Sequence, residues 1–63
     1  MYNLSWEEAQ QAMGEGKKVK HRYFCLGEWF EMKGGLVVCE GGYDMTNWYI
    51  GDDWQKNGWA IVQ

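Results

Sequence analysis

Trp48 and Asp52 are the two residues in this 63-residue sequence whose types and spacing best suit recognition of a small planar molecule. The flat face of a tryptophan ring stacks on a purine base, and such stacking is worth about 1–3 kcal/mol per base in single-stranded nucleic acids. A carboxylate accepts hydrogen bonds from ribose hydroxyls or from an exocyclic amine. The structural alternative places Trp48 in the core and makes Asp52 the cap of a helix.

Arg22 and Phe24 offer a second aromatic ring together with a partner for phosphate. Positions i and i+2 of a regular strand share a face, so the two side chains act together if the strand extends to Phe24. A guanidinium binds phosphate oxygens through two parallel hydrogen bonds. The alternative is that Phe24 fills the core while Arg22 lies in solvent.

The basic run 17–22, which contains Arg22, has two interpretations of its own. Its positive charges attract a pyrophosphate group. Alternatively, it is a solvated strand at the edge of a sheet, where charged side chains discourage pairing with other chains. His21 is the one histidine of the sequence, and alone it makes neither a metal-ligand set nor a base beside a nucleophile.

Five further rings either line a pocket or fill the core, and the sequence does not separate the two roles. They are Trp29, Tyr43, Tyr49, Trp54 and Trp59. Trp59 is the most core-like, because it lies among the apolar positions of a terminal strand. Tyr49 and Trp54 join the predicted ligand-binding set, which is Arg22, Phe24, Trp48, Tyr49, Asp52 and Trp54.

Catalysis is not expected from these residue types. No nucleophile, base and orienting group can be assembled, and Asp52 and Asp53 are adjacent in sequence instead of facing one another across a cleft. A G-x-x-x-x-G-K-[ST] phosphate loop is missing, as is a C-x-x-C pair for a metal. The prediction is a binding protein that is not an enzyme, with no catalytic residue, metal or cofactor.

Aromatic content is the most informative feature of the composition. Five Trp, four Tyr and two Phe make up 17% of the chain, more ring surface than so small a core is expected to hide.

The net charge of −3 disfavours direct binding to nucleic acid. With no signal peptide and no apolar run near the roughly 20 residues of a membrane span, the chain is expected to stay soluble where it is made. Cys25 and Cys39 are expected to be free thiols.

Local patterns predict one helix followed by short strands. Ser5 and Glu8 form a capping box that starts a helix over 5–14, and Gly14 and Gly16 end it. Gly34-Gly35 is a hairpin signal. Strands are predicted at 17–22, 28–33, 36–40, around 48–50 and at 59–62, the last closing the sheet, with one helical turn at 52–56.

The predicted fold is α+β: one N-terminal helix packed on a four- to five-stranded antiparallel sheet, in a single domain covering 1–63. One helix of this length covers only part of one face of the sheet. The other face then meets solvent, a ligand or another subunit. A homo-oligomer, dimer or tetramer, is therefore expected.

The two ends of the chain carry a resemblance to a known family. The N-terminal part contains S-W-E-E-A and then Gly16-Lys17-Lys18-Val19. The C-terminal part keeps Trp48 and Asp52 four residues apart and ends in G-W-A-I-V. This pattern resembles the type-two Thoeris anti-defence family of small phage proteins. Phe24 stands where those proteins usually have Trp, and Gly58 where they usually have Asp.

The resemblance implies a homo-oligomer in the host cytoplasm that sequesters a nucleotide-derived immune signal without cleaving it. In this family the signals are cyclic ADP-ribose isomers or cyclic oligonucleotides. No membrane partner is expected, because the sequence has no apolar run near the roughly 20 residues of a membrane span. The alternative function is a protein–protein inhibitor of a bacterial defence enzyme, since a similar protein is associated with blocking a CRISPR nuclease. A third is a structural or virion accessory domain.

Overall fold

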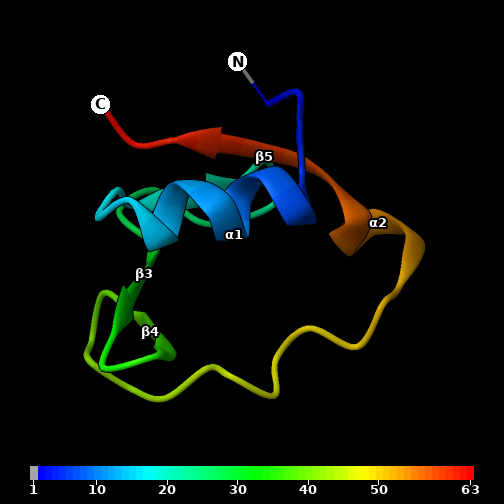
Figure 1. Ribbon diagram of the computed structural model, residues 1–63. Helices are drawn as coiled ribbons and strands as arrows, with labels where there is room; N and C mark the ends of the chain where they lie inside the picture. Colours follow the sequence, from blue (N-terminus) through cyan, green and yellow to red (C-terminus); the bar gives the residue numbers. More distant parts are fainter. Residues whose placement is uncertain (1) are drawn as a thin grey trace.

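Helix α1, Trp6–Gly14, begins where the capping box predicts (Figure 1). In the computed structural model, which describes residues 2–63, the Glu8 backbone N–H donates to Ser5 Oγ at 3.1 Å, and the Ser5 N–H donates to Glu8 Oε1 at 2.8 Å. Each bond satisfies an N–H that the helix itself leaves without a partner. Gly16, with φ at +89°, then turns the chain. The helix and both of its ends are confirmed.

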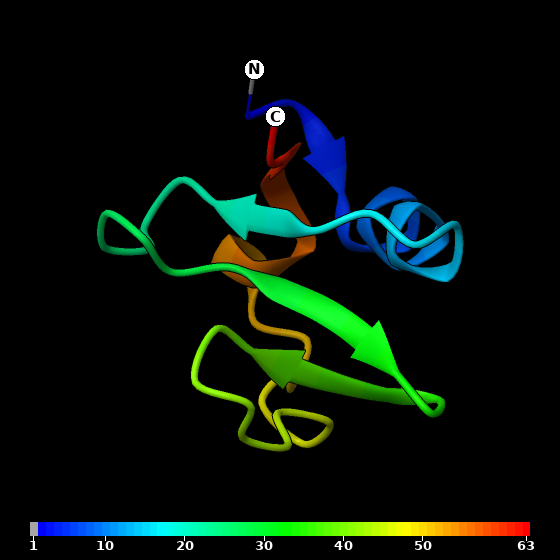
Figure 2. The ribbon, with the colours of Figure 1, turned by 90° about the vertical axis from the view of Figure 1, so that its left-hand side faces the viewer.

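Within residues 2–63, five strands form one antiparallel sheet, and a one-turn helix precedes the last of them (Figures 1 and 2). This confirms the α+β fold class. The strands and the second helix are β1 (Leu4–Ser5), β2 (Val19–His21), β3 (Phe30–Lys33), β4 (Leu36–Cys39), α2 (Asp53–Lys56) and β5 (Asn57–Ile61).

The order of strands across the sheet is β1-β5-β2-β3-β4, and it corrects two expectations. The C-terminal strand β5 does not close the sheet, because it lies between β1 and β2. Strand β2 is not an edge, because β3 lies on its other side (Figure 2). The basic run is therefore not protecting an exposed strand edge.

The inner face of the sheet carries the core, and α1 covers it. Val19, Phe30 and Trp59 from three strands are buried with Ala9 and Met13 of the helix. Trp59 is fully buried, which confirms its predicted role, and its indole N–H donates to the Gln55 carbonyl at 2.7 Å. Burying rings of this size is the main source of stability in a chain this short.

No strand forms at 48–50, which makes that prediction wrong. The segment after β4 is an irregular loop that runs back to α2 (Figure 1). The buried Gln55 side chain takes the place of a neighbouring strand: its Oε1 accepts from the N–H groups of Ile50 and Asp52, both at 3.1 Å, and its Nε2 donates to the Trp48 carbonyl at 3.0 Å. With these backbone groups satisfied, the loop needs no ladder of hydrogen bonds.

Replacing Gln55 with methionine tests this account. Methionine has a similar length but makes none of the three hydrogen bonds, so we expect a loss of about 2 kcal/mol in unfolding free energy, at about 1 kcal/mol or less per bond because the loop is partly open to water. Urea unfolding measures the change. An unchanged midpoint would contradict the role of Gln55.

The start of the same loop is held by Asp44. The Thr46 N–H donates to Asp44 Oδ1 at 2.9 Å. Hydrogen bonds from the Thr46 side chain and backbone hold the pKa of Asp44 below its usual range. A lowered folded-state pKa stabilises the protein above the ordinary pKa of the carboxyl, and this contribution is lost as pH falls through the lowered value.

The structure also bears on the state of the two cysteines and on a membrane span. Cys25 and Cys39 are both free thiols, as expected. Within residues 2–63 no helix has the length and apolar character needed to cross a bilayer.

Candidate functional site

A buried histidine joins three segments at one end of the sheet. His21 is 1% exposed. Its Nε2 lies 2.7 Å from the Trp54 carbonyl and 2.7 Å from the Asn57 carbonyl, and its Nδ1 lies 3.1 Å from the Tyr23 backbone N–H. Since carbonyls only accept and the backbone N–H only donates, these partners assign the proton to Nε2 and leave Nδ1 as an acceptor. The ring thereby fixes the turn after β2 against the end of α2 and the start of β5.

Glycine is required at position 58 beside this histidine. Gly58 has φ at +90°, and a Cβ there would lie 3.0 Å from His21 Nε2 and 3.0 Å from Arg22 Nε. Its carbonyl accepts from the Arg22 backbone N–H at 2.9 Å. Both the backbone angle and the lack of space exclude a larger side chain.

Gly58→Ala is expected to destabilise the protein by about 1–3 kcal/mol, the usual range for a strained backbone conformation. Displacement of the His21 ring should accompany the loss, because the added methyl group meets its Nε2. The thermal midpoint measures the first effect and the His21 ring signals in an NMR spectrum the second. Gly14→Ala is the control, since no atom lies within 4 Å of a Cβ at that position. Equal midpoints for the two variants would contradict the account.

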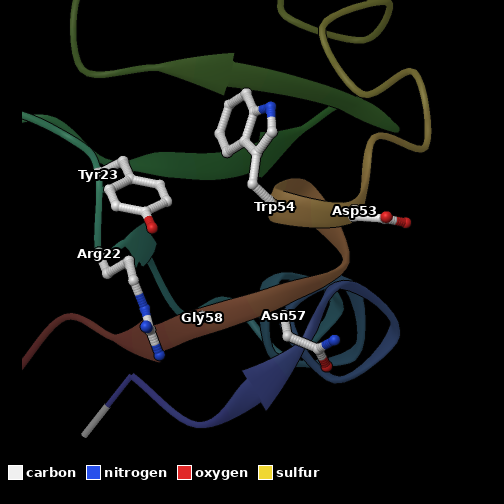
Figure 3. Close-up of a pocket in the computed structure, with 6 residues that line it drawn as sticks. All are labelled: Arg22, Tyr23, Asp53, Trp54, Asn57 and Gly58. Atoms are coloured by element: carbon white, nitrogen blue, oxygen red, sulfur yellow. The ribbon is translucent and has the colours of Figure 1, made fainter.

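The segments fixed by His21 surround a surface hollow of about 170 Å³ (Figure 3). Tyr23 and Trp54 stand on one side, 69% and 44% exposed. Their ring centroids are 6.1 Å apart and their planes are inclined by 62°. The full lining is Arg22, Tyr23, Asp53, Trp54, Asn57 and Gly58. We call this the ring hollow.

The charged groups of the ring hollow favour an anionic ligand. One Arg22 nitrogen donates to the Tyr2 carbonyl at 3.2 Å, which positions the guanidinium and leaves other N–H donors for a ligand. The Asp53 carboxylate is directed away from the two rings (Figure 3) and lies 3.6 Å from Lys56 Nζ. The hollow thus combines two aromatic faces with one guanidinium, while the Asn57 amide points away from both rings (Figure 3).

The predicted site residues are distributed over several places. Arg22 and Trp54 meet in the ring hollow. Phe24 and Trp48 lie together in a second hollow of about 130 Å³, half-buried, with ring centroids 5.8 Å apart.

The other two predicted site residues line neither hollow. Tyr49 stacks on Trp6, with centroids 4.7 Å apart and planes inclined by 5°. Asp52 is exposed and is the N-cap of α2. The proposed pair of Trp48 and Asp52 is therefore divided between the aromatic cluster beside the core and a helix end.

Sequence reasoning missed Tyr23, His21, Asn57 and Gly58 as parts of a site. One signal was available for His21, because it lies two positions after Val19 and strand alternation places both on the inner face. No local sequence pattern marks Tyr23 as a site residue, because it lies in the turn that follows β2. Asn57 and Gly58 join it only through the pairing of β5 with β2.

Neither a metal site nor a similar known protein adds to this description of the ring hollow. Among residues 2–63 no group of three or more His, Cys, Asp or Glu side chains is arranged to hold a metal ion. Comparisons with protein-family models, with curated proteins and with solved structures found nothing that matches this chain.

Proposed function

We propose that this protein binds and sequesters a nucleotide-derived signalling molecule, a cyclic ADP-ribose isomer or a cyclic oligonucleotide, at the ring hollow. The observation that carries the proposal is the exposed pair of Tyr23 and Trp54 beside the Arg22 guanidinium. The family resemblance at the two ends of the sequence supports the same ligand class.

The geometry suits a base linked to a phosphate. Because the Tyr23 and Trp54 planes are inclined by 62°, a flat base that stacks on one ring meets the other with its edge, an arrangement that aromatic groups favour. Arg22 then binds phosphate oxygens, with charge-assisted bonds stronger than neutral ones.

A second copy of the chain completes the site in this proposal. Ligand pockets usually measure about 300–1,000 Å³, whereas the ring hollow measures about 170 Å³. One chain therefore encloses only part of a dinucleotide-sized ligand. A dimer or tetramer that brings two ring hollows together would supply the missing enclosure.

To sequester the signal, the protein needs to bind it but not to cleave it. The protein acts in the host cytoplasm, where it lowers the free concentration of the signal once its dissociation constant falls below the signal's concentration. Stacking and a charge-assisted phosphate contact together give about 3–6 kcal/mol per base–phosphate unit. Two such units, one from each copy, total about 6–12 kcal/mol before the cost of association, and the upper part of that range corresponds to micromolar affinity or tighter.

Isothermal titration calorimetry against cyclic ADP-ribose isomers and cyclic di- and trinucleotides tests the proposal. We expect binding by at least one of these compounds at micromolar protein, and recovery of the unmodified ligand when the complex is denatured. No heat with any of them, or a cleaved product, would count against it.

An inhibitor of a bacterial defence enzyme is the second candidate. Leu26, Tyr43 and Ile50 are large apolar side chains that stand exposed outside the ring hollow, where a protein partner could bury them. Purification of the tagged protein from infected cells distinguishes the two. A stoichiometric host enzyme that survives removal of all nucleotides favours the inhibitor.

A further inference from the structure

A row of cations lies along β2 and the residues on either side of it. Val19 and His21 point into the core, so Lys20 between them points outward, and Lys18 and Arg22, directly before and after the strand, hold the alternate positions on the same side. The row follows paired backbone, because the Val62 N–H donates to the Lys18 carbonyl at 2.8 Å and the Arg22 N–H donates to the Gly58 carbonyl at 2.9 Å. Successive members are therefore about 7 Å apart. These three are half of the six Lys and Arg residues of the chain.

Their charges are not neutralised within the part of the chain that the structure describes. The ion pairs among residues 2–63 use other bases, Lys17, Lys33 and Lys56. Glu31 shares the outer face, but its carboxylate lies 3.8 Å from Lys33 Nζ. An acidic chain thus keeps three unpaired cations in one line.

A furrow over β5 reaches this row at Lys20. Ala60 is the outward residue of β5 opposite Lys20, and its methyl group is too small to fill the space above the sheet. Tyr2 and Leu4 line the furrow on the side of β1, and Lys20 lines it on the side of β2. Its volume is about 540 Å³, the largest of the hollows described here.

Two aromatic rings contact the row from its two sides, Trp29 beside β3 and Tyr2 beside β1. Lys18 Nζ lies 4.3 Å from the centroid of the Trp29 ring, and Lys20 Nζ lies 5.7 Å from the centroid of the Tyr2 ring. Each ring face is thus covered by a flexible ammonium group. Exposed cation–π contacts of this kind are weak, so a phosphate can draw the ammonium away and free the ring for a base.

From this arrangement we infer that the outer face of the sheet binds single-stranded nucleic acid. Lys18, Lys20 and Arg22 bind successive phosphates along the strand direction, and the ring faces of Tyr2 and Trp29 take the bases that the moving lysines uncover. Single-strand binding proteins combine the same two elements, a cationic groove and stacking rings. The net charge of −3 disfavours binding of nucleic acid to the molecule as a whole, but a ligand that contacts one face meets the three cations gathered there.

Other anionic partners fit the surface less well. Paired bases in a duplex present no free face to Tyr2 or Trp29. A membrane surface would meet the cations but would leave the furrow unused. An acidic peptide would meet the cations but has no planar groups for the rings.

Fluorescence anisotropy with a labelled ten-nucleotide single strand tests the inference on the full-length chain. Three phosphate contacts give a slope of about −2 in log affinity against log salt, a fall of roughly 20-fold between 50 and 200 mM salt. Lys20→Gln removes one contact and is expected to reduce that fall to about 7-fold. Lys17→Gln is the matched control, since it removes the same charge from a base paired with Glu15 outside the row.

Thermal unfolding of each variant verifies that the fold persists. The inference is overturned if the single strand does not bind at 50 mM salt, if a duplex of the same length binds as tightly, or if Lys17→Gln reduces the salt dependence as much as Lys20→Gln. Binding only to anionic vesicles or to a polyglutamate peptide also overturns it. Arg22 belongs to both surfaces, whereas Lys20 lines the furrow and not the ring hollow, so the effect of Lys20→Gln separates this inference from the proposed nucleotide site.

Discussion

His21→Leu is expected to lower the free energy of unfolding by about 3–5 kcal/mol. Leucine fills much of the space of the imidazole but leaves three backbone groups without their partner: the Trp54 and Asn57 carbonyls and the Tyr23 N–H. A buried polar group that loses its hydrogen bond costs about 1–3 kcal/mol. A chain of this length has about 3–9 kcal/mol of total stability, so the substitution removes a large share of it.

Far-UV circular dichroism and urea unfolding measure the loss. His21→Gln is the matched variant, because its side chain keeps one donor and one acceptor and should recover part of the stability. Folded His21→Leu with an unchanged urea midpoint would contradict the claim that this side chain holds the turn after β2 against β5. So would equal losses in the two variants.

Tyr23→Ala is expected to weaken binding of the nucleotide ligand by about 5- to 150-fold, which corresponds to the 1–3 kcal/mol of one stacked base. The fold should survive, because the Tyr23 side chain is exposed and alanine keeps the backbone N–H that donates a hydrogen bond to His21 Nδ1. Calorimetry with the tightest ligand of the panel measures the affinity.

Tyr43→Ala provides the control for this change. Tyr43 is 73% exposed, close to the 69% of Tyr23, but it does not line the ring hollow. Its removal should leave the affinity unchanged within twofold. If the two alanine variants lose affinity equally, or if neither does, the ligand does not stack on Tyr23.

Local signals were sufficient for the elements that local interactions define. The capping box and Gly16 determine α1, as the hydrogen bonds of Ser5 and Glu8 show. Gly34 and Gly35 have φ of +57° and +81°, as the tight turn between β3 and β4 requires. These features depend on residues only a few positions apart, so sequence patterns report them directly.

Non-local pairing explains most of what the sequence did not reveal. Nothing in the sequence of the last strand shows that it lies between β1 and β2. Apolar alternation predicts which face of a strand is buried, but it does not predict which strand pairs with it. The two-residue strand β1 is too short for any pattern. The 48–50 segment resembles a strand in composition, yet the Gln55 side chain satisfies its backbone.

The candidate site was the hardest part to predict for a related reason. Eleven rings compete for one small core, and only packing decides which remain outside. Trp59 is fully buried and Trp48 half-buried, whereas Tyr23 and Tyr43 stay exposed. Tyr23 reaches Trp54, 31 positions later in the sequence, only because His21 holds both segments.

An NMR titration of the five tryptophan indole N–H signals most directly tests whether the ring hollow is the ligand site. Addition of the tightest nucleotide from the calorimetric panel should shift the Trp54 indole and the Tyr23 amide the most. The Trp59 indole, buried and bonded to the Gln55 carbonyl, should stay in place. Shifts centred on Tyr43, or no shift with any nucleotide, would contradict the assignment of the ring hollow as the binding site.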